Sequence, residues 1–395
     1  MKYDVVKKSL ICILMILLMT PILLTNITQS APDTSFISNE PASFFLSPNI
    51  TIPDNYSTIQ EGINHANPGD CILVRSGIYR ESIELNKEGL LLQGEGKYTT
   101  IIDGGKTSED GVIISAPNVT LQGFTITNAR SDDKLIWDQS GIKIYSSNAT
   151  ITDNRFVSNR IGINTYTPSY NLTISENEFI DDGILLANYF NSEEYSGVTE
   201  ADFLHNITNN TVNGRPLYYY KHISNFTVPT DAGLVILVNC TNVTIKDLYM
   251  SHNDFSIILA YCSNCIVENV TVSDTDGEIL FEHSENNTFQ NNIISHTLKG
   301  ICLETESKNN IIRHNDFSYN YVGISVFTYS SDNEIYSNKV HDNEFAGIEV
   351  VSYHGGSQQR NLISENCVYG NKIGIYLQHN SCNNAIQNNT ISKIQ

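Results

Sequence analysis

The residues best suited to chemistry recur at one position of a repeating unit. Seven residues after the first apolar residue of successive units come His252, Asp274, His296, Tyr319 and Asp342. If the units stack in register, neighbours in this row lie about 5 Å apart. As a metal site the row offers His252, Asp274 and His296. As acid and base catalysts it offers His252, Asp274, His296 and Asp342. The alternative is that polar residues occur at this position only because turns are exposed to solvent.

A second group of candidates is acidic or aromatic. Carboxylates lie on or beside the Gly-Ile strands of the repeat: Asp276, Glu278, Glu282 and Glu304. Paired carboxylates are what glycoside hydrolysis requires. For ligand binding we single out Asp276, Glu282, Glu304, Tyr319 and the run Tyr218, Tyr219, Tyr220. The three adjacent tyrosines either stack on a sugar or pack their own segment against the protein.

These candidates sit on a repeat of about 22–24 residues. Its most constant phrase is an apolar residue, Asn three positions later and an apolar residue two after that. Examples are Phe289–Asn292–Ile294, Ile312–Asn315–Phe317, Ile335–Asn338–Val340, Ile363–Asn366–Val368 and Ile386–Asn389–Ile391. The phrase recurs upstream, with Leu, Val or Phe replacing Asn in three units. A period of this length indicates a repeat architecture.

The units alternate apolar and polar residues, as in Gly323–Phe327, which is the strand period. Such short strands need equivalent strands of the next coil to pair with. Asn suits the bend between strands because it tolerates the left-handed conformation, and stacked Asn residues can bond one another from coil to coil. The pattern resembles the right-handed parallel β-helix of the pectate-lyase type, so we expect an all-β, single-stranded solenoid.

Several segments frame the solenoid. Residues 1–30 carry a basic start and a short apolar stretch, which predicts a signal peptide, with an uncleaved membrane anchor as the alternative. Residues 31–50 are expected to be a linker and residues 51–395 the β-helix. A short capping helix is expected to begin at Ser57, with Ser57 and Gln60 as its capping box. Residues 187–232 break the rhythm. One coil can be recovered around Ile207, and the rest of this segment, including Asn213–Tyr220, is expected to leave the helix as an excursion.

The net charge of the chain limits the classes of partner that it can bind. The net charge of −20 disfavours nucleic acid and anionic membranes.

Seven cysteines remain after signal cleavage: Cys71, Cys240, Cys262, Cys265, Cys302, Cys367 and Cys382. Cys240 and Cys262 occupy equivalent places one coil apart, and either bridge or merely stack. Cys262-Ser263-Asn264-Cys265 is a lone C-x-x-C, which is too little for a zinc site. Thirteen Asn-x-Ser/Thr sequons are candidate glycosylation sites in a secreted chain.

Three longer segments carry a family resemblance. They are Ile52–Ile63 followed by Pro68-Gly69-Asp70, Asn210–Tyr219 and Asp231–Cys240. Together they resemble the NosD-type β-helix proteins, especially archaeal surface members, over roughly residues 51–395. That family takes its name from a periplasmic copper-binding protein that helps nitrous oxide reductase mature, and it shares its domain with carbohydrate-binding proteins and sugar hydrolases. The copper role transfers poorly, since one Met remains after the signal, Met250, at an apolar position.

We therefore expect a protein of the cell surface, periplasm or extracellular space, without a stable membrane span once the signal is removed. The leading hypothesis is a non-enzymatic module that binds polysaccharide or other envelope components. The alternatives are a polysaccharide lyase or glycoside hydrolase and a periplasmic copper-binding accessory protein. A divalent metal, calcium or copper, is the cofactor to test.

Overall fold

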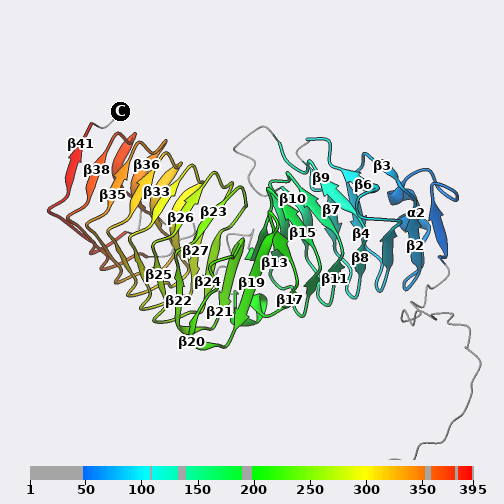
Figure 1. The fold of residues 1–395 in the computed structure, drawn as a ribbon, viewed down its shortest axis with the longest axis horizontal. Helices are drawn as coiled ribbons and strands as arrows, with labels where there is room; N and C mark the ends of the chain where they lie inside the picture. The colour runs from blue at the N-terminus through cyan, green and yellow to red at the C-terminus, as the bar shows by residue number, and fades with distance from the viewer. Residues whose placement is uncertain are drawn as a thin grey trace, which may run out of the picture. The chain divides into compact units, whose positions relative to one another are not determined.

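A computed structural model describes residues 48–106, 109–131, 139–188, 198–351, 357–378 and 381–393. The signal peptide expected at 1–30, and the linker expected at 31–50 up to residue 47, lie outside these described residues. The rest is almost entirely short strands stacked coil upon coil (Figure 1). The prediction of a parallel β-helix is confirmed.

The first run of coils, blue to green in Figure 1, is built on three sheets. Sheet 1 contains β1 (Ile50–Ile52), β2 (Cys71–Val74), β5 (Leu91–Gly94), β8 (Thr120–Gln122), β11 (Thr150–Thr152), β14 (Thr173–Ser175) and β17 (Asn206–Thr208). Sheet 2 contains β4 (Ile83–Leu85), β7 (Val112–Ile114), β10 (Ser140–Ile144), β13 (Ile161–Tyr166) and β16 (Ile184–Asn188). Sheet 3 begins with β3 (Gly77–Tyr79), β6 (Thr100–Asp103), β9 (Thr125–Thr127), β12 (Arg155–Val157), β15 (Glu178–Ile180) and β18 (Thr211–Val212).

The second run, green to red, shares sheet 3 and adds two sheets. Sheet 3 continues with β19 (Arg215–Lys221), β21 (Leu234–Val238), β24 (Ile257–Ala260), β27 (Glu278–Glu282), β30 (Lys299–Glu304), β33 (Val322–Val326), β36 (Ala346–Val350) and β39 (Ile373–Leu377). Sheet 4 contains β20 (Ser224–Thr227), β22 (Thr241–Lys246), β25 (Ile266–Glu268), β28 (Thr288–Gln290), β31 (Ile311–Arg313), β34 (Glu334–Tyr336), β37 (Leu362–Ser364) and β40 (Ala385–Gln387). Sheet 5 contains β23 (Tyr249–Ser251), β26 (Thr271–Ser273), β29 (Ile293–Ser295), β32 (Asp316–Ser318), β35 (Lys339–His341), β38 (Cys367–Tyr369) and β41 (Thr390–Ser392).

The two runs meet at one antiparallel pair. Strand β18 pairs antiparallel with β19, and β19 then pairs parallel with β21. Between them Asn213 and Gly214 have φ of 51° and 75°, as in the tight turns that join antiparallel strands. The expectation that Asn213–Tyr220 leaves the helix is therefore wrong. The rhythm breaks here because the chain doubles back and continues the same sheet with the opposite strand direction.

The reversal places the two cores on opposite faces of sheet 3. In β21, Leu234 and Ile236 belong to the apolar core of the first run, whereas Val235 and Leu237 belong to the core of the second. All five residues of β21 are buried. A central strand buried on both faces has a continuous apolar sequence instead of an alternating one.

The repeated Asn forms the ladders that the sequence predicts. Asn338 Nδ2 donates to Asn366 Oδ1 at 3.0 Å and to the Ile312 carbonyl at 2.8 Å. Its backbone is not left-handed, however; the residue before it, Ser337, has φ of 54°. The same shift holds along the row, because the left-handed residue makes the bend and the following Asn then points its amide inward.

The capping helix is present, but it begins later than expected. Helix α2 spans Ile59–His65, with Thr58 as its N-cap accepting from the Glu61 N–H at 3.1 Å. Ser57 and Gln60 do not form the capping box. A short 3-10 helix, η2 (Glu200–Phe203), follows the first run. No helix in the described part of the chain is long and apolar enough to cross a membrane.

Candidate functional site

The predicted row exists as a line of turn residues. His252, Asp274, His296, Tyr319 and Asp342 each follow a strand of sheet 5, and all have φ between 54° and 58°. Asp, Asn and His are the side chains that tolerate this left-handed region best. The repeated turn therefore explains why His and Asp recur at this position. Tyr319 does not fit that explanation, since a bulky side chain is unusual there.

The row is not the metal site that the sequence suggested. His252, Asp274 and His296 are exposed, and their coils are joined by backbone bonds such as His252 N–H to the Asp274 carbonyl at 3.0 Å. Among the described residues, one group of three His, Cys, Asp or Glu side chains has all its ligand atoms within 4.8 Å of one another, and none of these three belongs to it. The turns point the side chains outward, so they do not converge.

Part of the row does join a cluster on the outer face of sheet 5. His341 lies between two carboxylates: its Nδ1 is 2.7 Å from Asp342 Oδ2, and its Nε2 is 2.9 Å from Asp316 Oδ1. Lys339 Nζ donates to Asp316 Oδ2 at 2.9 Å. The hydrogen bond to Asp316 raises the pKa of Lys339 and outweighs the opposing effect of burial. Both carboxylates are about one-third exposed, so the cluster can be reached from solvent.

Aromatic rings run through this cluster along the helix axis. The His296 and Tyr319 rings stack at 5.4 Å, Tyr319 and His341 meet edge to face at 6.2 Å, and His341 and Tyr369 stack at 4.8 Å. Tyr319 is 57% exposed. We call the sheet 5 site the set His296, Asp316, Tyr319, Lys339, His341, Asp342 and Tyr369. Three of these residues were predicted from the sequence, whereas Asp316, Lys339, His341 and Tyr369 were not.

The missed residues were accessible to sequence reasoning. They occupy the outward positions of β32, β35 and β38, beside the inward Phe317 and Val340. Strand register places Asp316 against Lys339 and His341 against Tyr369. Following the outward positions of the sheet, in addition to the turn, would have found them. A surface pocket adjoins the site and is lined in part by Ile293, His314, Asp316 and Lys339.

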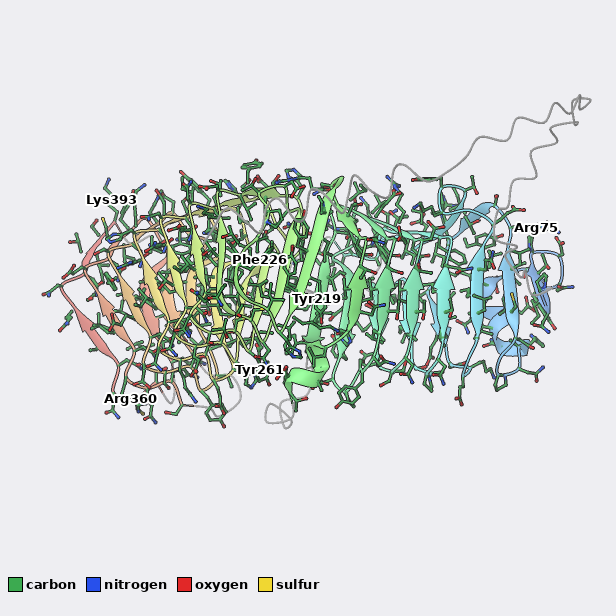
Figure 2. The ribbon with its side chains drawn as sticks, turned by 60° about the horizontal axis from the view of Figure 1, so that its bottom comes forward. Arg75, Tyr219, Phe226, Tyr261, Arg360 and Lys393 are labelled. Atoms are coloured by element: carbon green, nitrogen blue, oxygen red, sulfur yellow. The ribbon has the colours of Figure 1, made fainter. Side chains whose placement is uncertain are left out.

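The three tyrosines do not form one platform. They lie on β19 at the centre of the molecule, where Figure 2 labels Tyr219. Tyr218 and Tyr220 share one face and stack at 5.7 Å, against the core of the second run. Tyr219 faces the other way, donating to the Phe203 carbonyl at 2.7 Å, and burial raises its pKa to about 12. Tyr219 therefore packs its own segment against the protein and is not available to stack on a sugar.

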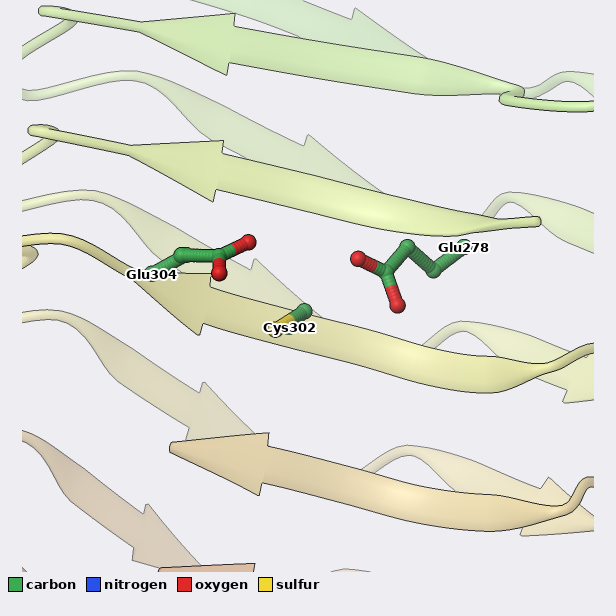
Figure 3. A group of neighbouring side chains, drawn as sticks. All are labelled: Glu278, Cys302 and Glu304. Atoms are coloured by element: carbon green, nitrogen blue, oxygen red, sulfur yellow. The ribbon is translucent and has the colours of Figure 1, made fainter. Parts of the chain in front are cut away.

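Two of the acidic candidates lie apart from the others: Asp276 precedes β27, and Glu282 is the last residue of that strand. Asp276 lies 3.4 Å from Arg130 and 3.8 Å from Arg160. Glu282 is buried beside His283, with Oε1 3.2 Å from Nδ1. Glu282 is therefore shielded from a ligand, whereas Asp276 is about one-third exposed and is paired with two arginines. Glu278 and Glu304, in contrast, converge with Cys302 (Figure 3), and these three form the group with ligand atoms within 4.8 Å.

This convergence does not suit a metal ion. Lys299 Nζ is 3.1 Å from Glu278 Oε2 and 3.7 Å from Cys302 Sγ, so a cation already occupies the space. Burial disfavours its charge, but Cys302 and the carboxylates Glu278, Glu304 and Glu349 outweigh burial and raise the pKa of Lys299. Burial also raises the pKa of the Cys302 thiol. A protonated lysine bonded to the same donors excludes a second cation.

Comparison with known proteins adds the family. The NosD family model, described as periplasmic copper-binding protein, matches residues 204–395, and the model of a family described as of unknown function, DUF1565, matches residues 80–238. No curated protein matches the sequence.

Solved structures resemble the chain at low identity. A periplasmic alginate epimerase is 13% identical, with a TM-score of 0.38, and the match covers 88% of this chain and 84% of the epimerase. A DFA-IIIase from Arthrobacter chlorophenolicus is 13% identical, with a TM-score of 0.34 and coverage of 91% and 97%. A mannuronic acid specific polysaccharide family 6 lyase from human gut microbiota is 11% identical, with a TM-score of 0.32 and coverage of 82% of each chain.

The NosD match over residues 204–395 coincides with the second run of coils, and the DUF1565 match covers most of the first. Together with the parallel coils, these matches support a right-handed parallel β-helix of the NosD type.

Proposed function

We propose that this protein is a non-enzymatic polysaccharide-binding module, secreted or displayed in the cell envelope, whose binding face is the sheet 5 site. The observation that carries the proposal is the aromatic row, which advances by one ring per coil from His296 to Tyr369. Coils repeat about every 4.8 Å, close to the length of one sugar residue in an extended glycan. An elongated glycan lying along the axis would meet an equivalent contact in each coil.

The polar groups beside the rings suit sugar hydroxyls. Asp316 and Asp342 offer acceptor oxygens, and Lys339 offers donors. Apolar ring surface with a few placed polar groups is the usual composition of a small-molecule site.

Two features favour binding over catalysis. Each ring nitrogen of His341 is engaged by a carboxylate, so neither is free to take a proton from a substrate. The close carboxylates Glu278 and Glu304 are tied to the Lys299 cluster, and Glu278 is only 8% exposed. A glycan chain cannot reach the buried Glu278 without moving the structure around it.

The test combines binding with turnover. The purified chain is applied to an array of neutral and acidic glycans, and each bound glycan is then incubated with the protein and examined for new reducing ends and unsaturated products. The proposal predicts retention of at least one glycan class without new products. Product formation would establish the lyase or hydrolase alternative instead, and no binding to any glycan would reject the proposal.

Copper handling is the second candidate function. The matched family is described as a periplasmic copper-binding protein. The favouring observation lies away from the sheet 5 site: Cys240, Cys262 and Cys265 are all fully buried, and Cys265 Sγ lies 3.7 Å from the Cys240 carbonyl oxygen.

A further inference from the structure

A buried lysine and a buried asparagine lie side by side on two neighbouring strands of the first run. Lys143 of β10 and Asn164 of β13 are Cα partners in the parallel register of sheet 2 (Figure 1). The residues beside them in these strands, Ile142 and Ile163, belong to the apolar core. Since side chains alternate along a strand, Lys143 and Asn164 both leave the opposite face of the sheet. On that face Lys143 is still only 7% exposed, and Asn164 is fully buried.

The side-chain amide of Asn164 is not used by the fold. Within the described residues, neither its Oδ1 nor its Nδ2 has a hydrogen-bond partner. Asn159, which precedes β13, shows how the amide of a ladder residue is satisfied. Its Nδ2 donates to Asp182 Oδ2 at 2.9 Å and to the Ile126 carbonyl at 3.0 Å. A buried amide without partners costs free energy, so the one at Asn164 needs an explanation beyond packing.

An acidic group and an aromatic ring complete the surroundings of Lys143. Asp110 Oδ2 lies 3.0 Å from Lys143 Nζ, and Asp110 Oδ1 accepts the Ser140 N–H at 2.8 Å, which holds the carboxylate in place. The ring of Tyr166, which is 3% exposed, is centred 5.7 Å from Nζ. An ion pair so little exposed to water carries a desolvation penalty. Transfer of a proton from the ammonium to Asp110 relieves it and leaves a neutral amine.

We propose that Lys143 and Asn164 join in an intramolecular isopeptide bond that ties β10 to β13. Neighbouring strands are about 4.8 Å apart, a gap that the flexible four-carbon stem of lysine can span. The neutral amine is the nucleophile, and it attacks Cγ of Asn164. The Nζ–Cγ bond forms and the Cγ–Nδ2 bond breaks. Asp110 carries the two protons that Nζ gives up to the departing nitrogen, which leaves as ammonium, and Asp110 is a carboxylate again at the end.

The bond needs no oxidant and no second reactant, and it is independent of glycan binding. It uses the amide that the ladder leaves without a partner. The low exposure of Lys143 and Tyr166 keeps out the water that would compete with the amine. A covalent tie between two consecutive coils restricts the unfolded chain, so it raises the resistance of the first run to unfolding.

The test is mass spectrometry of the full chain, with Lys143→Arg as the first variant. N-terminal processing is the same in both chains, so the wild type is expected to be lighter by one ammonia, about 17 Da, once the substitution itself is counted. Proteolytic digestion of the wild type is expected to release the peptide containing Lys143 joined to the peptide containing Asn164. The control, Lys372→Arg, changes an exposed lysine and is expected to keep the joined peptide.

A second variant keeps both partners of the bond and removes the proton carrier. Asp110→Asn retains an acceptor for the Ser140 N–H and is expected to lower the fraction of joined peptide at least tenfold. It keeps the test decisive if Lys143→Arg does not fold.

Three results would overturn the proposal. The first is a wild-type digest in which the Asn164 peptide is recovered unmodified, as expected if the amide only holds an ordered water. The second is a loss of ammonia that maps to a succinimide or to the N-terminus instead of a joined peptide. The third is a joined peptide as abundant in Asp110→Asn as in the wild type.

Discussion

The ring of Tyr319 stacks on that of His296 at 5.4 Å, although the Tyr319 backbone is held at φ of 58°. Holding a bulky residue in this region costs about 1–3 kcal/mol. Asn tolerates it better, so we expect Tyr319→Asn to melt at the same temperature as the wild type or higher, while its affinity for glycan falls. Thermal unfolding followed by circular dichroism measures the melting temperature, and glycan binding measured on the same samples gives the affinity. A marked drop in melting temperature would show that the ring serves the fold.

The Asn ladder is predicted to carry much of the stability of the second run. Asn338 bonds Asn315, Asn366 and the Ile312 carbonyl. Asn338→Ala leaves these buried groups without partners, which costs about 2–4 kcal/mol in the free energy of unfolding. Asn389→Ala, at the exposed end of the same row, is the matched control and is expected to cost less than half as much. Urea unfolding measures both, and equal losses would argue against a cooperative ladder.

His205 is expected to make the protein sensitive to acid. Burial lowers its pKa from 6.5 to about 4. Its Nδ1 accepts the Leu172 N–H at 3.5 Å, and its Nε2 is buried without a hydrogen-bond partner. A base whose pKa is lower in the folded state binds fewer protons there, so its contribution to stability is lost as pH falls through 6.5 toward 4. The loss between pH 6.5 and 5 is about 2 kcal/mol.

Replacing His205 by Gln isolates this contribution. The variant is expected to show a flatter dependence of unfolding free energy on pH between 6.5 and 4, whatever its absolute stability. His252→Gln, at an exposed turn, is the control and should keep the wild-type slope. An unchanged slope in His205→Gln would contradict the buried neutral imidazole.

Asp254 is expected to change the stability of the protein with pH in the opposite direction to His205. Its Oδ2 accepts the Gly162 N–H at 2.8 Å and the Gly183 N–H at 2.7 Å, which ties the second run to the first, while Oδ1 has no hydrogen-bond partner. Burial raises its pKa, and Asp276 adds to the effect. An acid whose pKa is higher in the folded state binds more protons there, so stability falls as pH rises above its unfolded value of 3.8.

Asp254→Asn retains an acceptor for the two glycine N–H groups and cannot ionise. It is expected to match the wild type near pH 3.5 and to exceed it in unfolding free energy by a margin that grows with pH. Urea unfolding across that range is the measurement. A variant less stable than the wild type at pH 8 would show that the ionised carboxylate is tolerated in the interior.

The repeated sequence pattern predicted the coils because each coil needs the same inward apolar residues and the same Asn at its bend. The Asn phrase predicted the ladder from Asn292 to Asn389. The reversal at Asn213-Gly214 was missed, since a turn of that type joins antiparallel strands and the surrounding repeat favoured parallel ones. The signal was nonetheless present in the dipeptide.

The site was foretold in part. The row from His252 to Asp342 was correctly predicted to stack from coil to coil. The left-handed turn, and not chemistry, explains why most of its residue types occur at this position. Asp316 and His341 come from outward strand positions, and their meeting with Asp342 depends on rotamers that no spacing rule supplies. Lys299 was missed for a similar reason: an irregularity in register between β27 and β30 sets it against Glu278.

We expect the rings of the sheet 5 site to bind glycan. The most direct test compares Tyr319→Ala with Tyr329→Ala by calorimetric titration of a glycan that the wild type retains. Both tyrosines have left-handed backbones, with φ of 58° and 59°, and both are exposed, at 57% and 45%, but Tyr329 lies outside the ring row. We predict that Tyr319→Ala raises the dissociation constant about tenfold or more, equivalent to about 1.4 kcal/mol, and that Tyr329→Ala leaves it unchanged. Equal affinities in the two variants and the wild type would contradict the account.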